Sequence, residues 1–140
     1  MAGVLCVDIH RFGDQTSAEQ ASSRLLLIAA LREALSTLQP RDWWQVDVQH
    51  GVLIVCPASP DHVMYLAQAM LLHPEAPGWC MGLHLGMLQR APDLEGRPQT
   101  VGDGVARARL IASHAAPGQA LASPAFVDAV TDARPGYAGL

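Results

Sequence analysis

The chain has 140 residues, half of them apolar and 16% charged, with a formal net charge of −4. This length and composition suit one globular domain with its own core and exclude a disordered chain. The acidic balance and the single close basic pair, Arg107 and Arg109, argue against a nucleic-acid surface. No apolar run approaches the roughly 18 residues that span a bilayer, and Met1–Asp8 lacks the features of a signal peptide. We therefore expect a soluble, cytoplasmic protein with neither nucleic acid nor membrane as a partner.

Lysine and asparagine are absent from the sequence, and all nine basic residues are arginines. Any mechanism that needs a lysine or an asparagine from this chain is therefore excluded. The three cysteines, Cys6, Cys56 and Cys80, lie inside apolar runs and show no metal-binding spacing. Without a secretory signal, they are expected to be reduced and buried.

The first half of the chain predicts a strand over Gly3–Asp8 and a helix over Ala18–Leu38. A hairpin of two strands follows, over Trp43–Val48 and Val52–Cys56, and then a second helix over Pro60–Leu72. The long helix rests on apolar residues at spacings of three and four: Leu25, Ile28, Leu31, Leu35 and Leu38. Pro40 ends it. The hairpin rests on β-prone runs around Gln49-His50-Gly51, and the second helix on Ser59 as its cap.

The second half predicts a strand over Trp79–Leu88, a loop over Arg90–Gly102 and a helix over Gly102–His114. A short strand over Gln119–Ala122 and a last helix that starts at Ser123 follow. The order describes an α/β (α+β) fold, with a ferredoxin-like βαββαβ core extended by an αβα unit. We expect one domain over residues 1–134, a frayed tail over 135–140, and Gly3–Asp8 as a central strand because it is almost wholly apolar.

Five stretches carry a family resemblance when taken in order: Val7–Phe12, Gln49–Val55, Gly82–Gly86, Val101–Leu110 and Ala116–Gln119. These stretches resemble segments of class III adenylate and guanylate cyclase catalytic domains. The first two resemble the opening metal-binding segment and the hairpin that carries the second metal ligand. The other three resemble the Gly-x-His-x-Gly strand, the ribose-orienting helix and the turn that follows this helix. The segment between Gly86 and Gly102 is shorter than in that family. The chain also ends about where the family's closing strand pair begins, so we expect a truncated or minimal form.

The resemblance implies a chemistry in which two aspartates hold two metal ions, an asparagine and an arginine act on the ribose and the charged transition state, and a lysine with a partner reads the base. The site lies between two subunits. In that chemistry the two metal ions neutralise the negative charge that develops as pyrophosphate leaves. The loss of any of these catalytic groups therefore removes electrostatic stabilisation of the transition state.

Mapped onto this sequence, the first metal position is Asp8 and the second is His50, a degenerate position. Imidazole suits Mg²⁺ poorly and Mn²⁺ or Zn²⁺ better. Asp47 lies three residues before His50, so strand alternation places it on the opposite face, where we expect it to be solvated. A hairpin-tip histidine without a ligand role is the alternative for His50. At most weak binding of Mg²⁺ or Mn²⁺ is implied.

The remaining positions are mostly degenerate too. The transition-state arginine is Arg109, for which a surface ion pair with a neighbouring acid is the alternative role. The ribose-orienting asparagine becomes Ala106, which has no polar side-chain group. The base-reading positions fall near Val46 and Gln99, and only the glutamine can hydrogen-bond a base edge.

The leading hypothesis is therefore a cyclase-homology domain of intracellular cyclic-nucleotide signalling that is catalytically inactive. As a pseudo-cyclase it would dimerise or bind ATP or GTP as a regulatory module. The alternatives are an active cyclase with a rebuilt site, half of a heterodimer with another cyclase-like chain, and a small-ligand sensor or assembly module on a ferredoxin-like scaffold. Trp43 and Trp44 are candidate contacts of a homodimer built on the face of Asp8 and His50, with burial in the core as their other role.

Overall fold

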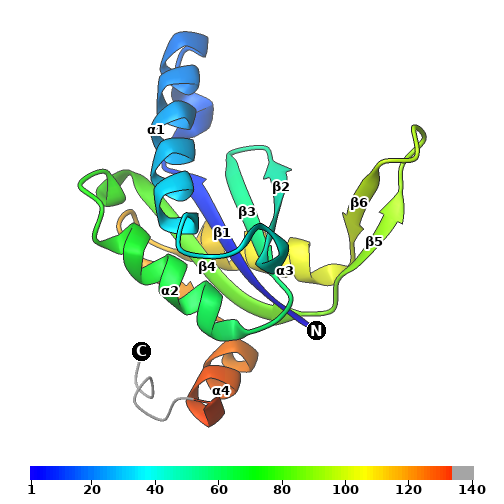
Figure 1. Ribbon diagram of the computed structural model, residues 1–140. Helices are drawn as coiled ribbons and strands as arrows, with labels where there is room; N and C mark the ends of the chain where they lie inside the picture. Colours follow the sequence, from blue (N-terminus) through cyan, green and yellow to red (C-terminus); the bar gives the residue numbers. More distant parts are fainter. Residues whose placement is uncertain (134–140) are drawn as a thin grey trace.

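The computed structural model describes residues 1–133, which form a mixed sheet with helices on both faces (Figure 1). The main sheet contains β1 (Ala2–Ile9), β2 (Trp44–Val48), β3 (Gly51–Cys56), β4 (Trp79–Gly86) and β7 (Ala120–Ala122). A separate hairpin contains β5 (Gln89–Pro92) and β6 (Pro98–Val101). The helices are α1 (Ser17–Leu35), α2 (Pro60–Leu71), α3 (Asp103–His114) and α4 (Pro124–Ala133), with short 3₁₀ turns at Phe12–Asp14, Pro40–Asp42 and Ala76–Gly78. The expected tail over 135–140 lies outside the described residues.

The strand order is β2-β3-β1-β4-β7, with β1 at the centre as predicted. β1 runs antiparallel to both β3 and β4, and the crossover through α3 brings β7 parallel to β4 at the edge. The first four strands have the ferredoxin-like arrangement, and α3, β7 and α4 form the added αβα unit. The predicted fold class is confirmed. The nearly continuous apolar sequence of β1 follows from its position, because both faces of this strand are covered.

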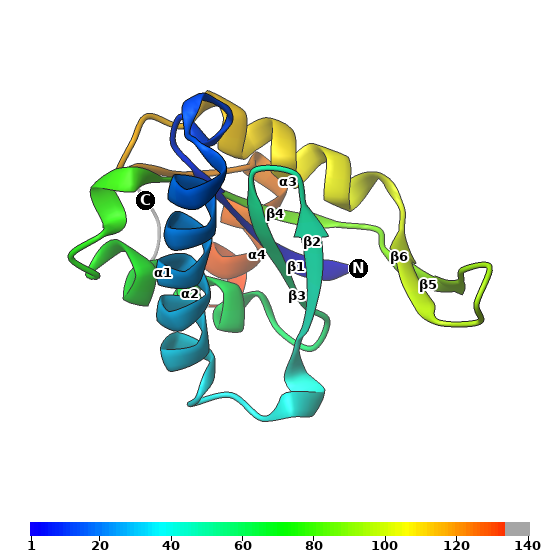
Figure 2. The same cartoon turned by 90° about the horizontal axis from the view of Figure 1, so that it is seen from above.

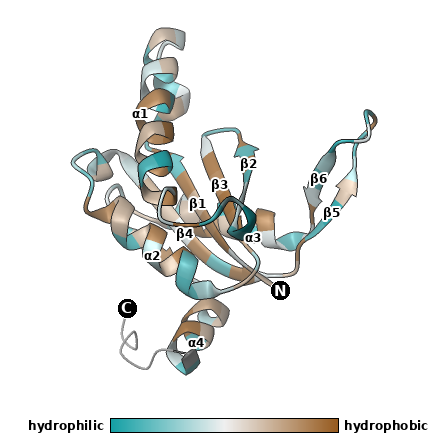
Figure 3. Cartoon of the chain, in the orientation of Figure 1, coloured by the Kyte–Doolittle hydropathy of each residue, from teal (hydrophilic) through white to brown (hydrophobic). Residues whose placement is uncertain are grey.

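Two hydrophobic clusters lie on opposite faces of the sheet (Figures 2 and 3). The larger packs α1, α2 and α4 against one face, here called the α1 face, and includes Leu5, Val7, Leu66 and Phe126. The smaller packs α3 against the other, the α3 face, and includes Val4, Cys6, Leu53 and Ala108. All three cysteines are buried, and burial raises the pKa of the Cys56 thiol to about 12.

Helix α1 begins one residue earlier and ends three residues earlier than predicted. Thr16 and Glu19 form a capping box, in which each side chain accepts a hydrogen bond from the other residue's backbone N–H. The residues buried on this helix are Leu27, Ala30, Leu31, Ala34 and Leu35. The prediction that Leu25 belongs to the buried stripe was wrong: it is 70% exposed, because it lies about 200° around the helix from Leu27. Within residues 1–133, no helix is long and apolar enough to cross a bilayer.

The segment Arg90–Gly102, predicted to be a loop, instead forms most of the β5–β6 hairpin. Its turn is organised by Asp93, whose carboxylate accepts hydrogen bonds from the backbone N–H groups of Glu95 (2.9 Å) and Arg97 (2.8 Å). Arg97 also forms an ion pair with Asp93 at 3.6 Å. The proline and glycine residues that suggested irregular structure therefore mark the turn and edges of a two-stranded ribbon.

Helix α3 approaches strand β4 closely at Gly82, the first glycine of the Gly82–Gly86 motif. A Cβ atom built on Gly82 would lie 2.5 Å from the backbone nitrogen of Ala112 and 2.6 Å from the carbonyl oxygen of Ala108. The histidine of the motif, His84, is also structural: its Nδ1 lies 2.8 Å from the Oγ of Ser123, which connects β4 to the start of α4. The motif that carried much of the resemblance thus holds helices against the sheet.

We predict that Gly82→Ala destabilises the protein by about 1–3 kcal/mol, because α3 must move away from β4 to accept the methyl group. Gly13→Ala is the matched control, since a Cβ there meets no atom within 4 Å, and it should change the free energy of unfolding by less than about 0.5 kcal/mol. Urea unfolding followed by circular dichroism measures both. Equal stability of the two variants would contradict the close packing of α3.

Candidate nucleotide and metal site

The candidate site lies at the carboxyl end of β1, where the turn between β2 and β3 passes beside it. Asp8 pairs in register with Gly51 on β3 and with Cys80 on β4, and the next residue, Ile9, donates its backbone N–H to the carbonyl of His50 at 2.9 Å. A Cβ on Gly51 would lie 1.9 Å from the carbonyl oxygen of Val7, so only glycine allows the hairpin to approach β1 this closely. This contact brings the turn that carries His50 next to Asp8.

The Asp8 carboxylate is half-buried and lies on the α3 face. It accepts a long hydrogen bond from the Cys6 thiol, with 3.5 Å between Sγ and Oδ1. Burial raises the pKa of Asp8, while the Cys6 hydrogen bond and the positive charges of His50 and Arg109 act in the opposite direction. The structure therefore brings three of the sequence-predicted site residues, Asp8, His50 and Arg109, within electrostatic range of one another.

Helix α3 carries Arg109 and Ala106 on exposed positions. The ion pair with Asp103 is made by Arg107, at 3.2 Å, and not by Arg109. Within residues 1–133, Arg109 makes no ion pair shorter than 4 Å, and its electrostatic interactions are with Asp8 and Cys6. Arg109 is thus available to an anion at this end of the sheet, whereas the methyl group of Ala106 offers no hydrogen bond.

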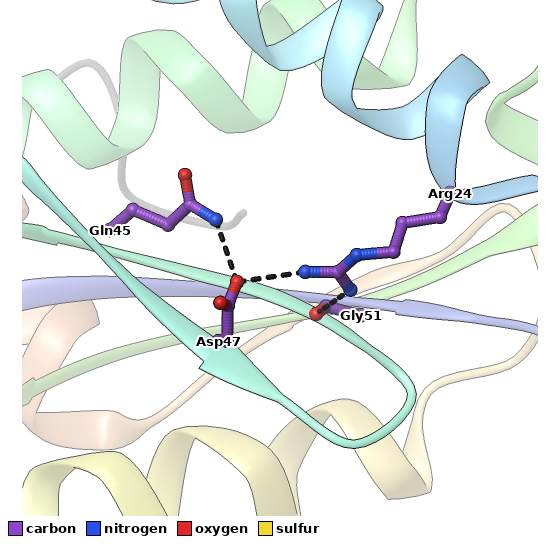
Figure 4. A network of polar contacts seen from close by, with 4 residues as sticks. All are labelled: Arg24, Gln45, Asp47 and Gly51. Carbon is purple, nitrogen blue, oxygen red and sulfur yellow. Dashed lines mark hydrogen bonds and ion pairs between the residues drawn. The ribbon is translucent and has the colours of Figure 1, made fainter. Parts of the chain in front are cut away.

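The acidic residue of the β2–β3 hairpin, Asp47, is held on the α1 face (Figure 4). Its Oδ1 accepts hydrogen bonds from Arg24 at 2.8 Å and from the amide of Gln45 at 2.7 Å. Arg24 also donates to the carbonyl oxygen of Gly51 at 2.9 Å. The Asp47 side chain is 73% exposed, as expected, but it is also paired with helix α1. The sequence did not predict this contact, because spacing along the strand does not reveal which helix lies beside it.

These donors fit one hard cation better than a pair. Asp8 supplies one carboxylate, and the His50 imidazole is exposed and packs against the ring of Phe12, with 6.1 Å between ring centroids. Mg²⁺ can be bound through one carboxylate together with waters and substrate phosphates, but a two-ion site needs further oxygen ligands. In the described part of the chain, no group of three or more His, Cys, Asp or Glu side chains is arranged to hold a metal ion.

The two base-reading positions, Val46 and Gln99, line one small cavity of about 250 Å³ between β2 and the β5–β6 hairpin. Trp44 forms its wall: its indole N–H donates to Thr100 Oγ1 at 2.8 Å, and the Arg90 guanidinium lies 4.2 Å from its ring centroid. Arg90 and Thr100 were not predicted as site residues, because their segment was expected to be a loop. Trp44 and Trp43 pack on opposite faces of the sheet.

At the level of sequence, no protein-family profile and no curated protein matches the chain. Solved structures do match. The dimeric guanylyl cyclase domain of the RhoGC fusion protein from Blastocladiella emersonii superposes with a TM-score of 0.71 at 16% identity, over 94% of this chain and 83% of that one. The guanylate cyclase domain of RhGC from Catenaria anguillulae, in complex with GTP, gives 0.69 at 19% identity, over 92% and 81%.

Adenylate cyclases from Trypanosoma brucei in their monomeric state match less closely, with a TM-score of 0.58 at 16% identity, over 91% of this chain and 74% of that one. The resemblance to class III cyclases is confirmed at the level of fold. The chain therefore has the fold of a nucleotidyl cyclase catalytic domain.

We predict that Asp8→Asn stabilises the protein at pH 7. Because the pKa of Asp8 is raised above 3.8, the folded state binds this proton more tightly than the unfolded state, and stability decreases as pH rises through the interval between the two values. The amide avoids that loss, so the advantage of Asp8→Asn should disappear in acid, below pH about 4. Asp128→Asn, with the same charge change at an exposed position of helix α4, is the control. Destabilisation at neutral pH by Asp8→Asn alone would show that the fold needs the carboxylate.

A second prediction concerns the Arg24 network. Arg24→Gln should cost about 1 kcal/mol, since it removes a partly exposed ion pair and a hydrogen bond to a backbone carbonyl. A double-mutant cycle with Asp47→Asn should give a coupling energy of about 0.5–1 kcal/mol. Hydrogen exchange at the β2–β3 turn should accelerate. Arg97→Gln, at the tip of the β5–β6 hairpin, is the control and should leave that exchange unchanged. Zero coupling would mean that Arg24 does not hold the hairpin.

Proposed function

We propose that this chain is a pseudo-cyclase: a nucleotidyl cyclase homology domain over residues 1–134 that binds nucleotide weakly or dimerises as a regulatory module of cyclic-nucleotide signalling, without cyclase activity of its own. The observation that carries the proposal is the orientation of two acids at the same end of the sheet, one on β1 and one on β2. Asp8 faces the candidate site, whereas Asp47 lies on the other face and is bound to Arg24. The site face of the hairpin thus supplies no second carboxylate.

The missing groups cannot be supplied from elsewhere in the chain. Lysine and asparagine do not occur in the sequence, so a homodimer lacks them as well. Removing one preorganised electrostatic group typically costs a hundredfold or more in rate, and several are missing here, although such losses do not simply add. Rapid cyclisation by this chain alone is therefore not expected.

What remains is suited to binding an anion. Asp8 can share one Mg²⁺ or Mn²⁺ with the phosphates of ATP or GTP, and Arg109 can pair with a phosphate oxygen. The Gln99 amide borders the cavity in which a base would lie. Each of these contacts can support binding without positioning the attacking hydroxyl, so binding and catalysis must be measured separately.

The test is an assay of the purified chain with ATP or GTP and with Mg²⁺ or Mn²⁺, read by mass spectrometry. We expect no cyclic nucleotide above background with Mg²⁺. Nucleotide binding should weaken at least about tenfold in Asp8→Ala and in Arg109→Gln, because each removes a charged contact. Cyclic nucleotide that forms with wild type and disappears in Asp8→Ala would overturn the proposal. Product that survives this substitution would point to contamination.

Assembly is part of the proposal. We expect a homodimer through the face of Asp8 and His50, and sedimentation that shows only monomer at high micromolar concentration would contradict it. The exposed, ion-pair-free Arg109 also favours a second candidate, a heterodimer in which this residue reaches a nucleotide held by another cyclase-like chain. Mixing the chain with such a partner should then raise cyclase activity, and Arg109→Gln should abolish the increase.

A further inference from the structure

A second cavity, of about 460 Å³, lies on the α1 face of the sheet, between the C-terminal half of α1 and the back of the β2–β3 hairpin. Its apolar lining consists mainly of Ile28, Leu31 and Leu35 from α1, Val52 and Ile54 from β3, and Trp43. The volume and the mainly hydrophobic lining are typical of small-molecule sites. Asp8 lies on the opposite face, and the proposed base cavity lies between β2 and the β5–β6 hairpin and shares only Gln45 with this one, so the two cavities are distinct.

Three polar side chains border this cavity. Arg32 and Ser36, near the end of α1, and Gln45 on β2 border the cavity, and Arg32 is its one ionisable lining residue. Arg32 is exposed and, like four other arginines in the described part of the chain, makes no ion pair within 4 Å, so its guanidinium is available to a ligand. An apolar pocket beside a single cation without a partner is complementary to a ligand with an apolar body and one negative charge.

We infer that this cavity binds a small amphipathic monoanion, such as a medium-chain carboxylate. The hydrocarbon chain would lie against Ile28, Leu31 and Trp43. The carboxylate would accept hydrogen bonds from the planar Arg32 guanidinium, whose fork matches its two oxygens, and from the amide of Gln45. The inference does not depend on the proposed function. Gln45 also donates to Asp47, so the cavity and the Arg24 network share one residue.

The test uses decanoate as the probe and the three tryptophan indole N–H signals as reporters in ¹H–¹⁵N spectra of the full chain. Trp43 lines the cavity, whereas Trp44 packs on the other face of the sheet. Decanoate should shift the Trp43 signal saturably and leave the Trp44 signal unchanged. Decanol and decyltrimethylammonium, which have the same chain and a neutral or cationic head group, should bind at least about fivefold more weakly.

Two arginine variants separate a specific head-group contact from general charge. Arg32→Gln should weaken decanoate binding at least about fivefold and leave decanol binding unchanged. Arg41→Gln makes the same charge change at an exposed residue outside the cavity and should have no effect. The inference is overturned by non-saturable binding, by equal affinity for the three head groups, or by equal effects of the two variants. A Trp43 signal that changes with protein concentration but not with decanoate would mean that a second copy covers the cavity, and would overturn it too.

Discussion

Helix α3 lies so close to strand β4 that no side chain fits between them at Gly82, where even a methyl group would overlap the helix backbone. This contact fixes the distance between α3 and the sheet. The buried Ala108 and Ala112 extend the close packing along the helix. Because α3 is held in this way, Arg109, which lies on the same turn, is within electrostatic range of Asp8 at the end of β1. The arrangement of the candidate site thus depends on a packing constraint between small residues, not on attraction between the charged groups.

The residues of the predicted motifs differ in how tightly packing constrains them. The glycines at 51 and 82 and the buried His84 serve packing, and any substitution there would disturb the sheet. His50 and Ala106 are exposed, so their side chains can change without a cost to folding. A chain can therefore keep the fold of a cyclase domain while it loses groups that the chemistry needs. Burial raises the pKa of Asp8, so the ionised form of this carboxyl group does not stabilise the fold.

The β2–β3 hairpin connects the two faces of the sheet. At the carboxyl end of β1 it brings His50 beside Asp8, and on the α1 face it is tied to helix α1 through Asp47 and Arg24. Gln45 extends this network to the edge of the cavity beneath α1. The hairpin is thus positioned by contacts with elements that are distant in sequence, and both the candidate site and the proposed ligand cavity depend on its position.

The sequence by itself determined the order of the main elements and the central position of β1, because apolar runs and turn residues act locally. The nucleotidyl cyclase fold was indicated by the resemblance of the motifs. The sequence also determined that lysine and asparagine are missing. Only the tertiary structure decided the partner of Asp47, the packing of Trp44 under Arg90 and the exposure of Leu25. The physical reason is the same in each case. The orientation of a side chain on a strand or helix follows from its period, but which group it meets depends on how elements far apart in the chain pack together.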